Sequence, residues 1–118
     1  MSYSRKHRRV LISGIAALKF AVRHKTSSIQ TAVANISLGG MGLYSYASVK
    51  AGTNVSINVN FISATGKLKT ASIEGSVIHT KKIERTFFIG IQFRKELNEK
   101  KYPSLCEHIQ KSLARECR

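Results

Sequence analysis

Apolar and polar residues alternate along most of the chain, and this period of two is typical of strands with one buried face. The clearest alternation runs from Asn54 to Ile62, where Val55, Ile57, Val59 and Phe61 are separated by Ser and Asn. The same pattern predicts five further strands: Ile15 to Arg23, Ile29 to Ile36, Leu43 to Tyr46, Leu68 to Thr80 and Thr86 to Arg94. The chain is therefore predicted to form a β-rich domain.

Glycine-containing and charged segments separate these strands and predict turns between them. The predicted turns are Lys25 to Ser28, Gly39 to Gly42, Ala51-Gly52, Ser63 to Lys67 and a charged hairpin loop from Lys81 to Arg85. Gly75 interrupts the fifth strand, where a glycine predicts a bulge or a barrel bend.

The period changes near the C-terminus, where Leu105, Ile109 and Leu113 recur at a spacing of four. Pro103 precedes them, and Ser104-x-x-Glu107 has the form of a capping box, so one helix is predicted. Its narrow apolar stripe favours packing on a barrel. Six strands and a terminal helix predict an all-β domain with one C-terminal helix: a six-stranded antiparallel β-barrel over residues 10–95, followed by residues 96–118.

The charge balance points to anionic partners. The 118 residues contain 20 Lys and Arg against 6 Glu and no Asp, and the net charge is +14. Such a chain attracts nucleotides, nucleic acids or anionic membrane surfaces. Carboxylates are too few and too scattered for paired acid/base chemistry or a two-metal site, so an enzyme is the least favoured class.

Histidine and cysteine spacings favour neither a metal site nor a disulfide. The four His are dispersed, and no H-x-x-x-H or C-x-x-C spacing occurs. Cys106 and Cys117 would lie ~16 Å apart on one helix, too far for an intrachain bond. Two free thiols fit a reducing compartment, and Cys106 is expected to be a buried small residue.

The N-terminal region is expected to be retained, in a cytoplasmic protein. A basic stretch followed by an apolar run resembles the start of a secretion signal, and Ala32-Val33-Ala34 resembles its cleavage site. Lys19 interrupts the apolar run, however, and Arg23 to Lys25 separates it from the supposed cleavage point. No uninterrupted apolar run is long enough to span a bilayer.

Two polar motifs carry the candidate chemistry. Arg5 and Arg9 form R-x-x-x-R, and Asn35, Ser37 and Gly40 form N-x-S-x-x-G. Arginine can grip a phosphate or the Hoogsteen edge of guanine with two donors, and its flat face can stack on a base. Asn and Ser are small polar groups suited to guanine edges and phosphate oxygens. Glycine permits a tight backbone and close approach of a ligand.

With the late segment Phe88 to Phe93, read as F-I-G-I-Q-F, these motifs resemble the PilZ domain family of bacterial receptors for cyclic di-GMP. The resemblance covers about residues 5 to 113 and implies the same barrel architecture. It also implies that residues 1–9 form a flexible loop that folds over the ligand. By this likeness, phosphate and guanine would be held by Arg5, Arg9, Asn35 and Ser37, with Gly40 supplying the tight backbone.

Arg8 lies between the motif arginines and is expected to add a contact. The resemblance implies a stand-alone receptor or adaptor with cyclic di-GMP as ligand and no cofactor or reaction. Binding would order the N-terminal loop and change the surface shown to an unidentified downstream effector protein.

Two other interpretations stay open. A basic barrel could bind RNA or single-stranded DNA, although the polar face of Asn54 to Ile62 shows Ser and Asn in place of aromatic rings. A PilZ-like scaffold could act through protein contacts without a ligand, against which the intact motifs argue. Tyr44 and Tyr46 are predicted to pack along a strand, and Phe87 to Phe93 to pack in the core.

Overall fold

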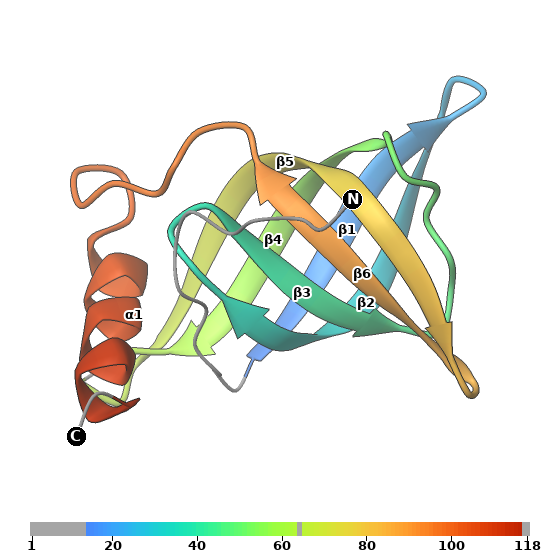
Figure 1. The fold of residues 1–118 in the computed structure, drawn as a ribbon. Helices are drawn as coiled ribbons and strands as arrows, with labels where there is room; N and C mark the ends of the chain where they lie inside the picture. The colour runs from blue at the N-terminus through green and yellow to red at the C-terminus, as the bar shows by residue number, and fades with distance from the viewer. Residues whose placement is uncertain (1–13, 64, 117–118) are drawn as a thin grey trace.

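The computed structural model describes residues 14–63 and 65–116 and confirms the predicted fold class (Figure 1). Six antiparallel strands close into a barrel in the order β1-β2-β3-β6-β5-β4, and one helix follows. The elements are β1 (Gly14–Val22), β2 (Lys25–Ile36), β3 (Gly40–Ser45), β4 (Asn54–Ile62), β5 (Leu68–Ile83), β6 (Thr86–Phe93) and α1 (Pro103–Glu116).

The predicted alternation of β4 is confirmed on both faces of the strand. Its apolar residues lie in the barrel core, where each is at most 2% exposed: Val55, Ile57, Val59 and Phe61. Its polar residues face outward and pair with those of β5 through hydrogen bonds of 2.7 Å, at Ser56–Glu74, Asn58–Ser72 and Asn60–Thr70. This outer face is therefore occupied by its own cross-strand contacts.

The antiparallel order separates the connections between strands into two groups. Because each strand reverses direction, one end of the barrel carries the β1–β2, β3–β4 and β5–β6 connections, and we call it the hairpin end. The opposite end, which we call the helix end, carries the β2–β3 and β4–β5 connections, the start of β1 and the exit toward α1. Figure 1 shows α1 at the latter end and the blue and orange hairpins projecting from the former.

Helix α1 packs against the helix end of the barrel. Leu105, Cys106 and Ile109 join the buried core. Just before the helix, the hydroxyl of Tyr102 donates a 2.7 Å hydrogen bond to the carbonyl of Ser72 in β5. The start of the helix is thereby fixed to the barrel wall.

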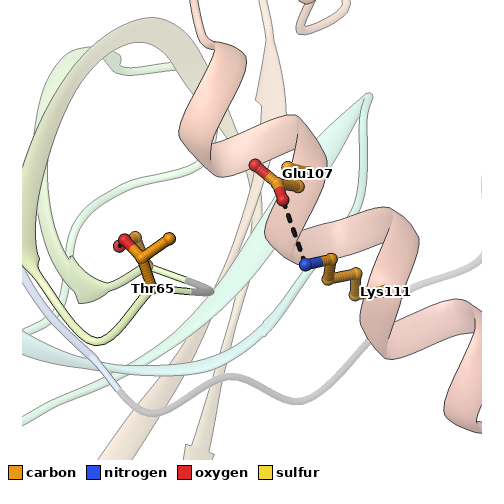
Figure 2. A network of polar contacts seen from close by, with 4 residues as sticks. Thr65, Glu107 and Lys111 are labelled. Atoms are coloured by element: carbon orange, nitrogen blue, oxygen red, sulfur yellow. Dashed lines mark hydrogen bonds and ion pairs between the residues drawn. The ribbon is translucent and has the colours of Figure 1, made fainter.

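The predicted capping box is wrong. The helix already begins at Pro103, the first-turn position that proline favours, so Ser104 lies inside the first turn. The carboxylate of Glu107 instead pairs with Lys111, one turn later, at 3.1 Å. Figure 2 shows this pair on α1, together with Thr65 of the β4–β5 connection.

Three predicted turns lie wholly or partly in strands. Strand β3 begins at Gly40, inside the turn predicted from Gly39 to Gly42. Strand β2 begins at Lys25, and the turn before it is only Arg23-His24, with φ of 49° and 69° as two-residue hairpins require. Strand β5 likewise continues to Ile83. Within the described residues, the extended parts of β2 and β5 each pair with one neighbouring strand only, so apolar and polar residues need not alternate along them.

The strand irregularity lies close to the position predicted for it, but Gly75 is not the bulge. The register between β5 and β6 shifts between Val77 and His79. At Gly75 itself, a β-carbon would lie only 2.7 Å from the carbonyl oxygen of Gln92, so the glycine permits a close approach of two backbones.

Candidate functional site

The N-x-S-x-x-G motif occupies the end of β2 and the tight connection to β3. The Ser37 side chain is 3% exposed, and its hydroxyl oxygen accepts hydrogen bonds from the backbone N–H groups of Gly39 and Gly40, both at 3.2 Å. The Ser37 N–H donates to the Gly40 carbonyl at 2.8 Å. The observed contacts of this serine therefore stabilise the turn, and its predicted contact with a ligand stays a prediction.

The last residue of β6 and a residue after the strand anchor the same turn from the other side. The N–H of Phe93 donates to the Gly39 carbonyl at 2.9 Å, and the N–H of Leu97 donates to the Leu38 carbonyl at 2.8 Å. Phe93 and Leu97 are both buried. The motif turn is therefore held by its own serine and by the segment that leads into α1.

Asn35 is half-buried in β2, beside a register shift that begins after Val33. It pairs with Gly42 of β3, and a β-carbon at Gly42 would lie 3.1 Å from the Asn35 Oδ1 atom and 2.5 Å from Cζ of Phe88. The Asn35 amide oxygen and the Phe88 ring thus approach the same point above Gly42. Only glycine leaves room for both side chains in this arrangement.

A row of aromatic rings continues from this point across the outside of the barrel. The Phe88 ring stacks on the imidazole of His79 with centroids 5.9 Å apart, and it meets Tyr44 edge-on at 5.5 Å. Gly90 lies under the His79 ring, since a β-carbon there would overlap it. Tyr44, His79 and Phe88, named here the outer ring row, border Asn35 on the barrel surface.

The prediction that Phe87 to Phe93 pack in the core did not anticipate the outward position of Phe88 in the outer ring row. That prediction is confirmed for the alternate residues Ile89, Ile91 and Phe93, which are buried. Phe88 lies on the opposite face, and its position follows from the strict alternation of β6. Packing along the strand is wrong for Tyr46, which is 85% exposed.

Arg5, Arg8 and Arg9 lie outside the described residues, so their predicted ligand contacts stay predictions. The chain that carries them joins β1 at Gly14, at the helix end of the barrel. Ile15 pairs with Ala32, and Asn35 lies about 10 Å further along β2. Five residues span at most about 17 Å, so Arg9 is within reach of Asn35.

Other parts of the described chain give weaker candidate sites. A hollow of about 320 Å³ between β5 and the start of α1 includes none of the motif residues. Cys106 is buried as predicted, and burial, with a smaller effect of the Glu99 carboxylate, raises the pKa of its thiol, which disfavours a nucleophilic thiolate. Among the described residues, no cluster of His, Cys or Glu could hold a metal ion, and no helix could cross a bilayer.

Solved structures with the same fold include cyclic di-GMP complexes. The PilZ domain of Escherichia coli YcgR with c-di-GMP matches with a TM-score of 0.67 and 16% identity, covering 98% of this chain and 95% of that one. The larger E. coli YcgR complex with c-di-GMP matches at a TM-score of 0.68 and 20% identity, covering 97% of this chain and 47% of that one.

The inhibitor of motility from Bacillus subtilis, MotI/DgrA, matches with a TM-score of 0.74 and 12% identity over 98% of this chain. The chain spans about half of that protein, 53% of its length. No curated protein is significantly similar in sequence. The family model described as PilZ domain matches residues 3–114, nearly the whole chain, and the chain therefore belongs to the PilZ domain family.

Proposed function

We propose that this protein is a receptor for cyclic di-GMP. The observation that carries the proposal is that the N-x-S-x-x-G turn lies at the end of the barrel where the N-terminal chain enters β1. The Asn35 to Gly40 segment closes the β2–β3 connection there, and the chain that bears Arg5 and Arg9 enters β1 at the same end. Membership of the PilZ family and the fold shared with cyclic di-GMP complexes support the assignment.

The residue types suit a dianion that carries two guanines. The arginine forks supply positive charge and paired donors for phosphate or for the guanine Hoogsteen edge. The amide of Asn35 can match donors and acceptors on a guanine edge. The turn from Ser37 to Gly40 is already fixed by hydrogen bonds, so its ordering costs little when a ligand arrives.

A guanine bound at Asn35 would lie beside the outer ring row, because Asn35 and Phe88 adjoin the same point above Gly42. The Phe88 and His79 rings offer apolar and π surface for stacking, and stacking on an aromatic side chain is worth ~1–3 kcal/mol per base. The proposed site therefore combines Arg5, Arg8 and Arg9, the motif turn and these rings.

The proposed mechanism is one of binding and presentation, without a reaction. The arginine segment closes over the bound ligand, and the ordered surface is then recognised by a downstream effector protein in the cytoplasm. The entropy lost in ordering the segment is offset by charge-assisted contacts to the ligand.

Isothermal titration calorimetry with cyclic di-GMP tests the proposal and gives affinity and stoichiometry together. We expect submicromolar to low-micromolar binding, with GTP and mononucleotides far weaker. Backbone relaxation of the Arg5 to Arg9 amides, with and without ligand, tests closure of the segment. The absence of both heat and a shift in melting temperature at a large ligand excess would show that the protein is not this receptor.

A second candidate function is binding of RNA or single-stranded DNA. The exposed ring of Tyr46 favours it, because such proteins stack bases on exposed aromatics beside basic residues. In that case a Tyr46→Ala variant would lose affinity for oligonucleotides, while cyclic di-GMP would compete poorly with them.

A further inference from the structure

The hairpin end of the barrel carries two projecting ribbons. Beyond Lys19, the described part of β1 pairs only with β2, and the tip of this ribbon is Arg23-His24. The second ribbon is formed by the last residues of β5 with the start of β6, and its tip is Glu84-Arg85. Figure 1 shows both ribbons extending from the barrel on the side away from α1.

The charge at this end is strongly positive. The exposed basic residues of the two ribbons and of the intervening β3–β4 connection are Arg23, Lys25, Lys50, Lys81, Lys82 and Arg85. Glu84 is the acidic residue within these segments. A surface of this composition attracts an extended anionic partner through many weak contacts.

Each ribbon also presents an exposed aliphatic residue immediately before its turn. Val22 is 49% exposed and Ile83 is 42% exposed, and each belongs to the last residue pair of its hairpin, Val22–Lys25 and Ile83–Thr86. Phosphate contacts do not need aliphatic side chains, whereas a bilayer accepts them at the boundary between headgroups and acyl chains. The combination of basic and aliphatic side chains on the ribbons therefore favours a membrane surface over a nucleic acid as the partner.

We propose that the hairpin end is a docking surface for a bilayer of anionic phospholipid, with Val22 and Ile83 entering the interface and the surrounding Lys and Arg contacting headgroups. The exposed Tyr46, which follows β3 toward this end, fits the same setting, because tyrosine favours membrane–water interfaces. The motif turn lies at the helix end, whereas the outer ring row reaches toward the hairpin end, where Phe88 pairs with Lys81. Docking therefore leaves the motif turn accessible, and the proposal does not depend on the receptor function.

Cosedimentation of the full chain with vesicles tests the proposal. Vesicles of phosphatidylcholine alone are compared with vesicles that also contain phosphatidylglycerol, at low and high salt, without cyclic di-GMP. The parent protein should bind the anionic vesicles, and salt should weaken the binding. Equal binding to neutral vesicles would contradict the proposal.

Charge-matched variants locate the surface. The ribbon variant Lys25→Gln/Lys82→Gln/Arg85→Gln should bind anionic vesicles about a hundredfold more weakly, because each charge removed should weaken binding about fivefold. The control Lys67→Gln/Lys69→Gln/Lys100→Gln removes the same charge from exposed positions away from the ribbons and should keep most of the affinity. Equal losses in these two variants would overturn the proposal, and melting temperatures confirm that both are folded.

An aliphatic variant separates the bilayer from other anions. Val22→Thr/Ile83→Thr keeps the charge and the strand preference, and it should weaken vesicle binding at least about threefold. Unchanged vesicle binding in this variant would exclude insertion of the tips and overturn the proposal. The proposal would also be overturned if the variant Lys25→Gln/Lys82→Gln/Arg85→Gln lost affinity for RNA or duplex DNA but still bound vesicles.

Discussion

The backbone N–H of Leu97 donates a 2.8 Å hydrogen bond to the carbonyl oxygen of Leu38, and so joins the segment before α1 to the centre of the motif turn. Leu97 is 5% exposed, so water does not compete for this bond. The turn is thus held by the barrel itself, and we expect it to change little when a ligand binds.

The Ser37→Ala variant should lose stability as well as ligand affinity. Two backbone N–H groups, of Gly39 and Gly40, would lose the hydroxyl that accepts their hydrogen bonds. Unsatisfied buried donors cost about 1–3 kcal/mol, so the free energy of unfolding should fall by an amount in this range. Urea denaturation and calorimetry with cyclic di-GMP measure the two effects. A variant with the parent's stability and affinity would show that this hydroxyl supports neither turn nor site.

The Arg9→Ala variant should bind cyclic di-GMP about ten- to a hundredfold more weakly, because a charge-assisted contact of ~1.5–3 kcal/mol is lost. Lys50→Ala removes the same charge from the β3–β4 connection at the far end of the barrel and should change the affinity little. If both variants lose affinity equally, the attraction reflects diffuse charge and the site assignment is wrong.

The Gly42→Ala variant should weaken ligand binding by displacing Phe88. The new methyl would lie 2.5 Å from Cζ of Phe88 and 3.1 Å from Oδ1 of Asn35, so the ring must rotate away. Forcing a side chain off its rotamer costs about 0.5–1.5 kcal/mol, so the fold should survive. Ring chemical shifts of Phe88 and His79 report the displacement, and calorimetry reports the affinity.

Gly52→Ala is the matched control for this change. Gly52 has a φ of 94° and nothing within 4 Å of a new β-carbon, so alanine there strains only the backbone. It should lower the melting temperature without changing the affinity for cyclic di-GMP. A control that lost as much affinity as Gly42→Ala would mean that the loss reflects general destabilisation.

Stability should fall at alkaline pH in a manner that depends on Cys106. Burial, with a smaller effect of Glu99, raises the pKa of this thiol in the folded protein. The unfolded chain therefore loses the proton first, and the stability contributed by the protonated thiol is present below the unfolded pKa of about 8.5. It is lost as pH rises toward the folded pKa. Urea midpoints across this range should fall less steeply for Cys106→Ala than for the parent.

The barrel strands were predictable where one face is buried. Strand β4, from Asn54 to Ile62, has the bounds that its alternation predicts, because it contacts the core on one face along its whole length. The ribbons were not predictable in the same way. Thr26 to Ser28 and Lys81-Lys82 pair with a single described strand and are exposed or half-buried, so solvent contact removes the apolar signal that marks a strand.

The candidate site was predictable only in part. Asn35, Ser37 and Gly40 lie at the end of β2 and in the connection to β3, where glycine and small polar residues are typical, and their ligand contacts stay predictions. The outer ring row was not predicted, because an apolar ring in a strand is normally assigned to the core. The outward position of Phe88 follows from the alternation of β6, but its contact with Tyr44 depends on the pairing of β6 with β3, two strands that are distant in the sequence.

The closure of six strands into a ring also limits how the molecule can aggregate. Open sheets recruit further chains by adding a strand to a free edge, and every strand here has two neighbours in the barrel order. The two ribbons differ, because within the described residues β2 from Lys25 to Gln30 pairs with β1 alone and β5 from His79 to Ile83 pairs with β6 alone. Edge-to-edge association would begin at these short segments, and the charges of Lys25, Lys81 and Lys82 oppose it through repulsion between copies.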